Sequence, residues 1–221
     1  MSESQAAGGT TANPDGYRQL ERYRGLIFDL DGTLVDSMQY HIRAWQEVGA
    51  ARGLALSYDY LMSNGGRPSL LIAREIIARY HLPDDEQDLQ REKTANYVRQ
   101  IPNIAIYPAM RSLLEYAHAR SIPMIIGTGT LRSNVEAVMR HTGLDAYVSS
   151  FVSSEMVKAH KPAPDTFVAS ARAIGQIPED CLVFEDAPLG IEAARRGGMD
   201  CCVVKDGRFS LDEIIRNRSV L

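Results

Sequence analysis

Residues 25–33 read GLIFDLDGT, and this stretch decides the fold of the chain. Four largely apolar residues are followed at once by Asp29 and Asp31, and Gly32 then allows a tight turn. A short apolar run without polar alternation is typical of a parallel strand that is buried on both faces. Side chains two residues apart in an extended segment point the same way, so we expect the two aspartates to converge on one point.

Four later apolar runs repeat this pattern, at residues 123–126, 147–152, 181–184 and 201–204. Segments with helical periodicity accompany them, at residues 109–120, 132–142, 165–174 and 189–196. Alternation of strands and helices predicts an α/β fold, with a Rossmann-like, doubly wound parallel sheet and right-handed crossovers.

The interval between the first strand and Ile122 is too long for a single crossover helix. Helical patterns fill it, at residues 40–52, 70–80 and 84–100. We therefore expect an inserted helical cap at residues 38–107, with Trp45 in the core of that cap. The Rossmann-like core is then expected at residues 21–37 and 108–221, after a flexible tail at residues 1–20 that begins with a Gly- and Thr-rich stretch.

Composition excludes several classes of protein. The formal net charge of −4 argues against a nucleic-acid or anionic-membrane partner, and no stretch approaches the ~20 apolar residues of a membrane span. The start of the chain lacks the apolar segment of a secretory signal. The three cysteines, Cys181, Cys201 and Cys202, indicate buried residues of a reducing compartment rather than disulfides. We expect a cytoplasmic monomer.

Three more polar clusters follow expected strands: GTGT at residues 127–130, Lys161-Pro162, and Glu185-Asp186. Ligands bind at the carboxyl ends of parallel strands in open α/β sheets, so these clusters should share one edge with Asp29 and Asp31. Alone, each fits an ordinary loop or helix cap, and for GTGT and Lys161 that is the favoured interpretation. Together they indicate a site, because several carboxylates beside one lysine would repel each other without a hard cation such as Mg²⁺.

In this order the motifs resemble those of the haloacid-dehalogenase superfamily, in its phosphatase and phosphomutase branch with a helical cap. The similarity runs from Tyr23 to Val204 and rests on DLDGT, the hydroxyl of Thr128, KPAPD and FEDAPLGIEAARRGGM. The resemblance implies that Asp29 is a nucleophile that forms an aspartyl-phosphate, and that Asp31 is the general acid and base. It implies that Thr128 and Lys161 bind the phosphate oxygens.

The resemblance also implies a Mg²⁺ cofactor, bound by the Asp29 carboxylate, the Asp31 backbone carbonyl and Asp186, with Glu185 close by. Gly129 and Thr130 belong to the expected binding loop for the phosphate of the substrate, since glycines expose backbone N–H groups to an anion.

The cap is expected to choose the substrate. DSMQYHIRAW (residues 36–45) and REKTANYV (residues 91–98) are similar to segments of β-phosphoglucomutases. There the residue matching Lys93 lies over the active site, and the one matching His41 couples cap closure to proton transfer. We expect both to bind substrate, although a hinge or surface position for His41 remains open.

Three features differ from β-phosphoglucomutases: Thr33 replaces a valine, GTG at residues 127–129 replaces a Ser-Ala-Ser pattern, and Arg67 lies one place from their substrate-binding arginine. These features fit the fructose-1-phosphate phosphatase type of bacterial sugar phosphatase. We expect Mg²⁺-dependent hydrolysis of a small, fructose 1-phosphate-like sugar phosphate. The alternatives are a β-phosphoglucomutase that interconverts β-glucose 1-phosphate and glucose 6-phosphate, and a non-catalytic phosphosugar-binding protein.

Overall fold

A parallel sheet of five strands carries the site in the computed structural model, which describes residues 14–217. The strands are β1 (Gly25–Phe28), β2 (Met124–Gly127), β3 (Phe151–Val152), β4 (Cys181–Glu185) and β5 (Asp200–Val203). Their order across the sheet is β3-β2-β1-β4-β5, and every neighbouring pair is parallel. The expected α/β fold with a doubly wound sheet is therefore confirmed.

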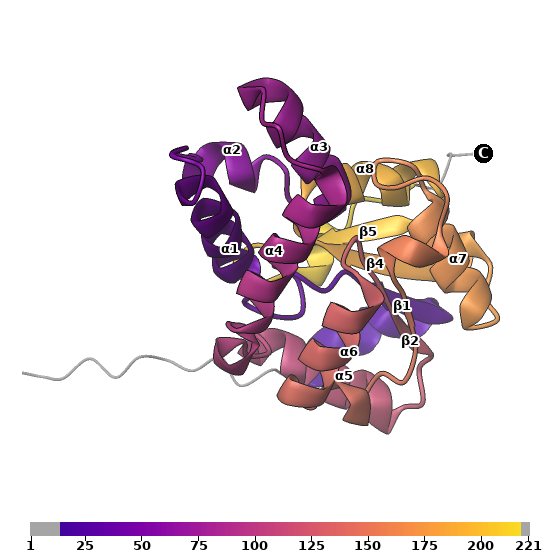
Figure 1. Cartoon of the computed structure of the whole chain (residues 1–221). Coiled ribbons are helices and arrows are strands. Elements are labelled where there is room, and N and C mark those ends of the chain that lie inside the picture. Colours follow the sequence, from indigo (N-terminus) through magenta and orange to yellow (C-terminus); the bar gives the residue numbers. More distant parts are fainter. Residues whose placement is uncertain (1–13, 218–221) are drawn as a thin grey trace, which may run out of the picture.

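Helices cover both faces of this sheet (Figure 1). On one face lie α5 (Pro108–Ala119) and α6 (Arg132–Thr142), and on the other lie α7 (Asp165–Ala173) and α8 (Pro188–Arg196). Successive side chains of β1 point to opposite faces of the sheet. Leu26 and Phe28 pack in the hydrophobic cluster with α5 and α6, and Ile27 packs in the cluster with α7 and α8. The apolar run at residues 25–28 is thus buried on both faces because helices lie on each side of it.

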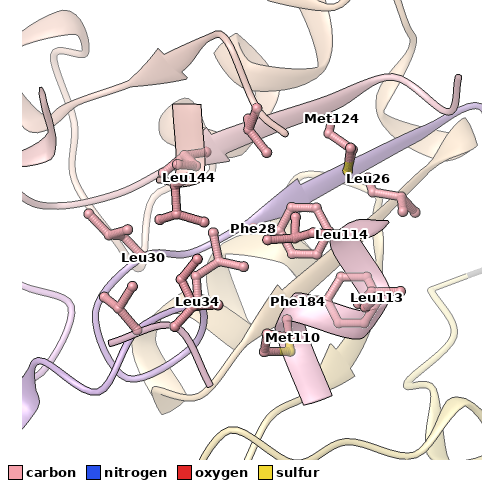
Figure 2. Packing of buried hydrophobic residues seen from close by; sticks show 14 of the residues in the cluster. Leu26, Phe28, Leu30, Leu34, Met110, Leu113, Leu114, Met124, Leu144 and Phe184 are labelled. Atoms are coloured by element: carbon pink, nitrogen blue, oxygen red, sulfur yellow. The ribbon is translucent and has the colours of Figure 1, made fainter. Parts of the chain in front are cut away.

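The layer that contains Phe28 is shown in Figure 2. Phe28 of β1 stacks on Phe184 of β4 with their ring centroids 5.0 Å apart, and Leu113 and Leu114 of α5 pack against the same cluster. All four side chains are fully buried. These contacts keep the ends of β1 and β4 side by side, where the acidic residues begin.

Four helices lie together beside the sheet, in the segment that the sequence predicts to be a cap (Figure 1). They are α1 (Met38–Ala50), α2 (Tyr58–Met62), α3 (Ser69–Tyr80) and α4 (Glu86–Val98). They enclose a hydrophobic cluster of their own, formed by Ile42, Trp45, Val48, Leu56, Leu61, Ile72, Ala73, Ile76 and Leu89. Trp45 is 3% exposed, as expected for a core residue of the cap.

Some expected bounds differ from those of the structure. The start of the chain is ordered earlier than expected, because Pro14–Arg22 forms a 3-10 helix in which Leu20 is buried and Tyr17 packs edge-on against Tyr116. The flexible tail expected at residues 1–20 is therefore wrong for residues 14–20, and residues 1–13 lie outside the described part. The apolar run at residues 147–152 yields only the two-residue β3, because the amides of Tyr147 and Val148 donate to the Leu144 carbonyl of the preceding 3-10 turn.

Further short 3-10 helices lie at Ile101–Asn103, Ser154–Met156, Pro178–Asp180 and Leu211–Glu213. The three cysteines are buried and free, as expected. Among residues 14–217, no helix has the length and apolar character that a membrane crossing requires.

The buried layer under α5 should contribute strongly to stability. Leu114→Ala removes a fully buried side chain and leaves a cavity, so we expect the free energy of unfolding to fall by about 2–5 kcal/mol. Urea denaturation followed by circular dichroism measures this. Ile177→Ala is the matched control, because Ile177 is 57% exposed and its loss should change stability by less than about 0.5 kcal/mol. Equal losses in the two variants would contradict this assignment of the core.

Candidate active site

The register of the sheet places three chain segments at one edge. Phe28 of β1 pairs with Ile126 of β2 on one side and with Phe184 of β4 on the other. The residues that follow each strand therefore lie at the same level, and the Asp29 amide donates to the Phe184 carbonyl at 3.0 Å. The convergence of Asp29 with the acidic end of β4 is a direct result of this register.

A buried lysine joins two of these carboxylates. Lys161 Nζ lies 2.5 Å from Asp29 Oδ1 and 2.7 Å from Glu185 Oε2. The three residues are at most 4% exposed. Burial alone would lower the pKa of Lys161, but the two carboxylates outweigh it and raise that pKa. Burial and the nearby Glu185 raise the pKa of Asp29 well above its usual value. The charge of Lys161 thus offsets the repulsion between the carboxylates of Asp29 and Glu185.

Asp29, Glu185 and Asp186 form a possible metal site. Each offers a carboxylate oxygen, and these oxygens lie within 4.8 Å of one another. Burial and the charge of Glu185 raise the pKa of Asp186 to about 7, and Thr33 Oγ1 donates to Asp186 Oδ1 at 2.8 Å. Crowded oxygen donors with raised pKa values fit a hard divalent cation such as Mg²⁺, which would relieve their mutual repulsion.

Glu185 has a second set of partners that limits its part in metal binding. Its Oε2 accepts from Lys161, and its Oε1 accepts from the Ala187 amide at 2.9 Å. Both of its oxygens are therefore engaged, whereas Asp29 and Asp186 each have one carboxylate oxygen outside these hydrogen bonds. Glu185 is therefore better placed to position Lys161 beside a bound cation than to be a ligand of that cation itself.

Asp31 has the opposite electrostatic environment. Thr130 Oγ1 donates to its Oδ2 at 2.6 Å, and Ser37 Oγ donates to its Oδ1 at 2.6 Å. His41 Nε2 lies 2.9 Å from the same Oδ1. Burial alone would raise the pKa of Asp31, but His41 and the two hydroxyls bring it below its usual value. Asp31 is thus favoured as an anion, whereas the pKa of Asp29 is shifted in the opposite direction.

His41 links Asp31 to Lys93 of the cap. Lys93 Nζ lies 2.6 Å from His41 Nδ1, and the Tyr97 ring stacks on the imidazole at a centroid distance of 3.9 Å. Burial and then the Lys93 charge lower the pKa of His41, which favours the neutral imidazole. In that state Nδ1 accepts from Lys93 and Nε2–H donates to Asp31. Only 15% of the His41 side chain is exposed, so the surface position that the sequence left open is not adopted.

The GTGT loop supplies the third wall of the site. Thr128 is 2% exposed, and its Oγ1 accepts from the Thr130 amide at 3.1 Å. Together with Gly129, these two threonines line a cavity that Asp29 and Asp31 also line. Residues of α1–α4 and of the loops between them line the opposite side, namely His41, Lys93, Met38, Ile42, Trp45, Leu61, Asn64, Gly65, Gly66, Arg67, Ser69 and Ile72.

The structure therefore brings all ten residues expected from the sequence into one region, and eight of them line the cavity or adjoin it through Lys161. Glu185 and Asp186 lie beside it, at the end of β4. Ser37 and Tyr97 also donate hydrogen bonds to Asp31, although no role was expected for either residue of the DSMQYHIRAW and REKTANYV segments. Their roles depend on the distance to Asp31, which no local pattern encodes.

Two glycines meet across the cavity. The Gly66 carbonyl oxygen lies 2.5 Å from the position that a Cβ atom on Gly129 would occupy. Gly66 has a φ of +79°, a conformation that glycine adopts without strain. A cap loop can therefore rest on the GTGT loop only because Gly129 carries no side chain. We name this contact the glycine seat.

Comparisons with known proteins agree with this geometry. A family model for haloacid dehalogenase-like hydrolases matches residues 23–198. The fructose-1-phosphate phosphatase YqaB of Escherichia coli is 41% identical over 186 residues, which cover 84% of this chain and 98% of that protein. The resemblance expected from the motifs is confirmed by these matches.

Two solved structures extend the comparison. The β-phosphoglucomutase of Clostridium difficile superposes with a TM-score of 0.75 at 25% identity, covering 81% of this chain and 83% of its own. CbbY of Rhodobacter sphaeroides, in complex with phosphate, superposes with a TM-score of 0.73 at 27% identity, covering 86% and 89%.

The glycine seat generates a prediction about the position of the cap loop. Gly129→Ala should force Gly66 away, at a cost of about 1–3 kcal/mol to the present arrangement. Trp45, the single tryptophan of the chain, lines the cavity, so we expect acrylamide to quench its fluorescence more strongly in the variant. Gly16→Ala is the control, since a Cβ at Gly16 meets nothing within 4 Å. Identical quenching in both variants would show that the loop does not depend on the seat.

Lys93 generates a prediction about stability and pH. Burial lowers the pKa of Lys93 from 10.5 to about 8 in the folded protein. Between these values the unfolded state binds more protons than the folded state, so stability rises with pH in this window. Between pH 8 and pH 10.5, the free energy of unfolding of the wild type should rise by up to about 3 kcal/mol relative to that of Lys93→Met. Urea denaturation across this range measures the difference, and parallel curves for the two proteins would refute the shift.

Proposed function

Because the chain belongs to the haloacid dehalogenase-like hydrolases, we propose that it hydrolyses small sugar phosphates such as fructose 1-phosphate, with Mg²⁺ as its cofactor. The observation that carries this proposal is the buried set of Asp29, Lys161 and Glu185 at the wall of a cavity that Asp31 also lines. The 41% identity to an enzyme named for fructose 1-phosphate supports the choice of substrate.

In this proposal Asp29 is the nucleophile. One of its carboxylate oxygens attacks phosphorus in line, the bond from phosphorus to the ester oxygen breaks, and an aspartyl-phosphate forms. Lys161, held by Glu185, lies 2.5 Å from Asp29 and can stabilise the charge on the transferring phosphoryl group. Thr128, Gly129 and Thr130 line the same cavity, where hydroxyl and N–H groups can bind the phosphate oxygens.

Asp31 acts second. It gives a proton to the departing sugar oxygen, and as a carboxylate it then takes a proton from the water that attacks the aspartyl-phosphate and releases inorganic phosphate. Because its hydrogen bonds lower its pKa, Asp31 needs a proton donor before the first step. His41 Nε2–H can pass a proton to Asp31 while Lys93 gives one to His41 Nδ1, and the distances of 2.9 Å and 2.6 Å support this route.

Asp29 and Asp186, with the backbone carbonyl of Asp31, would bind the Mg²⁺ ion, beside Glu185. When bound, the ion supplies positive charge that offsets the repulsion between an anionic nucleophile and an anionic phosphate. Thr33 contributes by orienting Asp186 through its 2.8 Å hydrogen bond. This is a role that a valine at position 33 could not perform, since valine has no hydroxyl group.

We further propose that residues 38–107 act as a cap that admits substrate and excludes bulk water, over a core formed by residues 21–37 and 108–221. The separate hydrophobic cluster of α1–α4 and the cavity between these helices and the sheet support this division. A monomer acting in the cytoplasm is our proposal for its working state, in keeping with the buried free cysteines.

A β-phosphoglucomutase activity is the second candidate, favoured by the likeness to a solved β-phosphoglucomutase and by the Lys93–His41–Asp31 chain. A mutase would protect the aspartyl-phosphate from water until a sugar hydroxyl arrives. A non-catalytic phosphosugar-binding protein is the third candidate, and pure binding gives no reason for both Asp29 and Asp31.

Phosphate release from a panel of sugar phosphates tests the three candidates. We expect Mg²⁺-dependent release of phosphate from fructose 1-phosphate, and no release after the metal is chelated. The rate should fall at least about 10³-fold in Asp29→Asn. Asp206→Asn is the matched control, since Asp206 lies near Asp186 but does not line the cavity of Asp29. β-Glucose 1-phosphate with glucose 1,6-bisphosphate should yield little glucose 6-phosphate.

Other outcomes have definite meanings. Efficient, bisphosphate-dependent formation of glucose 6-phosphate with little phosphate release would establish the mutase instead. Tight binding of sugar phosphates without any turnover would establish the binding protein.

A further inference from the structure

A second cavity lies beside the acidic end of β4, where the chain passes between the proposed core and the proposed cap. The chain enters the cap next to Asp36 and leaves it next to Tyr107, and the Tyr107 hydroxyl donates to Asp36 Oδ1 at 3.4 Å. Both residues line this second cavity, which we name the hinge cavity. The argument below uses six further residues that line it, namely Gly32, Met38, Met62, Asp186, Lys205 and Asp206.

The possible metal site lies between the hinge cavity and the cavity that contains the GTGT loop, which we name the substrate cavity. Asp29 lines the substrate cavity, and Asp186 lines the hinge cavity. Their carboxylate oxygens belong to the set that lies within 4.8 Å. Met38 lines both cavities and therefore stands at their boundary. A cation held by Asp29 and Asp186 is thus adjacent to two openings of different composition.

Gly32 leaves space beside Asp186 on the side of the hinge cavity. A Cβ atom on Gly32 would lie 2.4 Å from Asp186 Oδ2, and the φ of Gly32 is +88°. Thr33 Oγ1 donates to the other carboxylate oxygen, Oδ1. The oxygen that Thr33 leaves free therefore faces a space that any side chain at position 32 would fill, and a cation can approach that oxygen from the hinge cavity.

The hinge cavity is negatively charged. Among the described residues that line it are three carboxylates, Asp36, Asp186 and Asp206, and one cation, Lys205. Burial and then the charges of the same three carboxylates raise the pKa of Tyr107, which shows that these charges act on one region. Such an opening raises the local concentration of a divalent cation and repels an anionic phosphate ester.

The substrate cavity suits a hydrated cation less well. Its cap side includes the apolar side chains of Met38, Ile42, Trp45, Leu61 and Ile72. Mg²⁺ gives up its water ligands reluctantly, so it needs a polar approach along which its hydration shell can be kept. A sugar phosphate bound between the GTGT loop and the cap would also block the approach from this side.

We propose that Mg²⁺ enters and leaves its site through the hinge cavity, while the phosphate ester uses the substrate cavity. This inference rests on the Mg²⁺ site of the proposed function and adds a separate route for the ion. Asp36 and Asp206 raise the rate at which the ion arrives, and turnover at saturating Mg²⁺ does not depend on them. Movement of the cap about its two chain crossings displaces the hinge cavity least, so the ion can exchange while substrate occupies the other cavity.

Opposite charges placed at one exposed position test this route. Met62 of α2 is 38% exposed and lines the hinge cavity, so its replacement changes the charge of the opening without removing a buried contact. Relative to Met62→Gln, the association rate constant of Mn²⁺ should rise about 2- to 5-fold in Met62→Glu and fall by a similar factor in Met62→Lys at low ionic strength. The differences should shrink in about 0.5 M KCl, because salt screens exposed charges.

Mn²⁺ is the probe because carboxylate sites that suit Mg²⁺ also bind Mn²⁺. The loss of the EPR signal of free Mn²⁺ gives Kd in a titration of the full chain. Stopped-flow mixing with a chelator and a fluorescent metal indicator gives the dissociation rate constant, and its quotient with Kd gives the association rate constant. Neither measurement depends on turnover.

Matched variants locate the effect in the hinge cavity. Lys205→Glu should also speed association, since it replaces the cation of the opening by a carboxylate. Ile177→Glu and Ile177→Lys are the controls, because Ile177 is 57% exposed and precedes β4 at the opposite edge of the sheet. Their association rate constants should agree within about 1.5-fold. Ser69→Glu and Ser69→Lys place the same charges in the substrate cavity and should differ less than the Met62 pair.

The outcomes that would overturn the proposal leave different conclusions standing. A larger difference within the Ser69 pair than within the Met62 pair would show that the ion enters through the substrate cavity. Equal association rates throughout the Met62 and Lys205 variants, with normal Mg²⁺-dependent phosphate release, would remove the inference and keep the proposed function. Absence of Mn²⁺ binding in the wild type, together with absence of Mg²⁺-dependent hydrolysis, would reject both.

Discussion

The ammonium group of Lys161 lies between Asp29 and Glu185 in a part of the protein that excludes water, and the other features of the site depend on this arrangement. A charge buried in this way is strongly destabilising unless its partners are held at hydrogen-bond distance. Asp29 follows β1 and Glu185 ends β4, so their spacing is set by the register of the two strands. The Phe28–Phe184 stack below them fixes that register from the hydrophobic side.

The two aspartates that follow β1 lie in opposite electrostatic environments. Burial and neighbouring carboxylates raise the pKa of Asp29, whereas an imidazole and two hydroxyls lower the pKa of Asp31. Separation of this kind between neighbouring titratable groups is a usual sign of divided chemical roles. The partners of Asp29 come from the end of β4 and from the loop before α7, while His41 and Tyr97 reach Asp31 from α1 and α4. The state of Asp31 therefore depends on where the cap lies, and that of Asp29 does not.

Much of this arrangement could be predicted from sequence because it is local. GLIFDLDGT and the later apolar runs specify strands whose ends bear acidic or hydroxyl groups, and the topology of a doubly wound sheet brings those ends together. Other features depend on contacts that no periodicity encodes. The five-residue α2 is too short to produce a pattern, and the helix before β1 is held by packing of Tyr17 and Leu20. The pairing of Arg67 with Glu75 and the approach of Gly66 to Gly129 likewise depend on packing between segments, which no local pattern encodes.

The contact between Gly66 and Gly129 also constrains how such a protein can diverge. A side chain at position 129 would be tolerated only if the cap loop had already moved, and a shifted loop would no longer need glycine on the opposite side. The two positions should therefore show strong epistasis, with single substitutions harmful and certain paired substitutions neutral. Attempts to redesign the substrate range by transplanting the loop around Gly66 from a relative would then succeed only when the facing loop after β2 is exchanged with it.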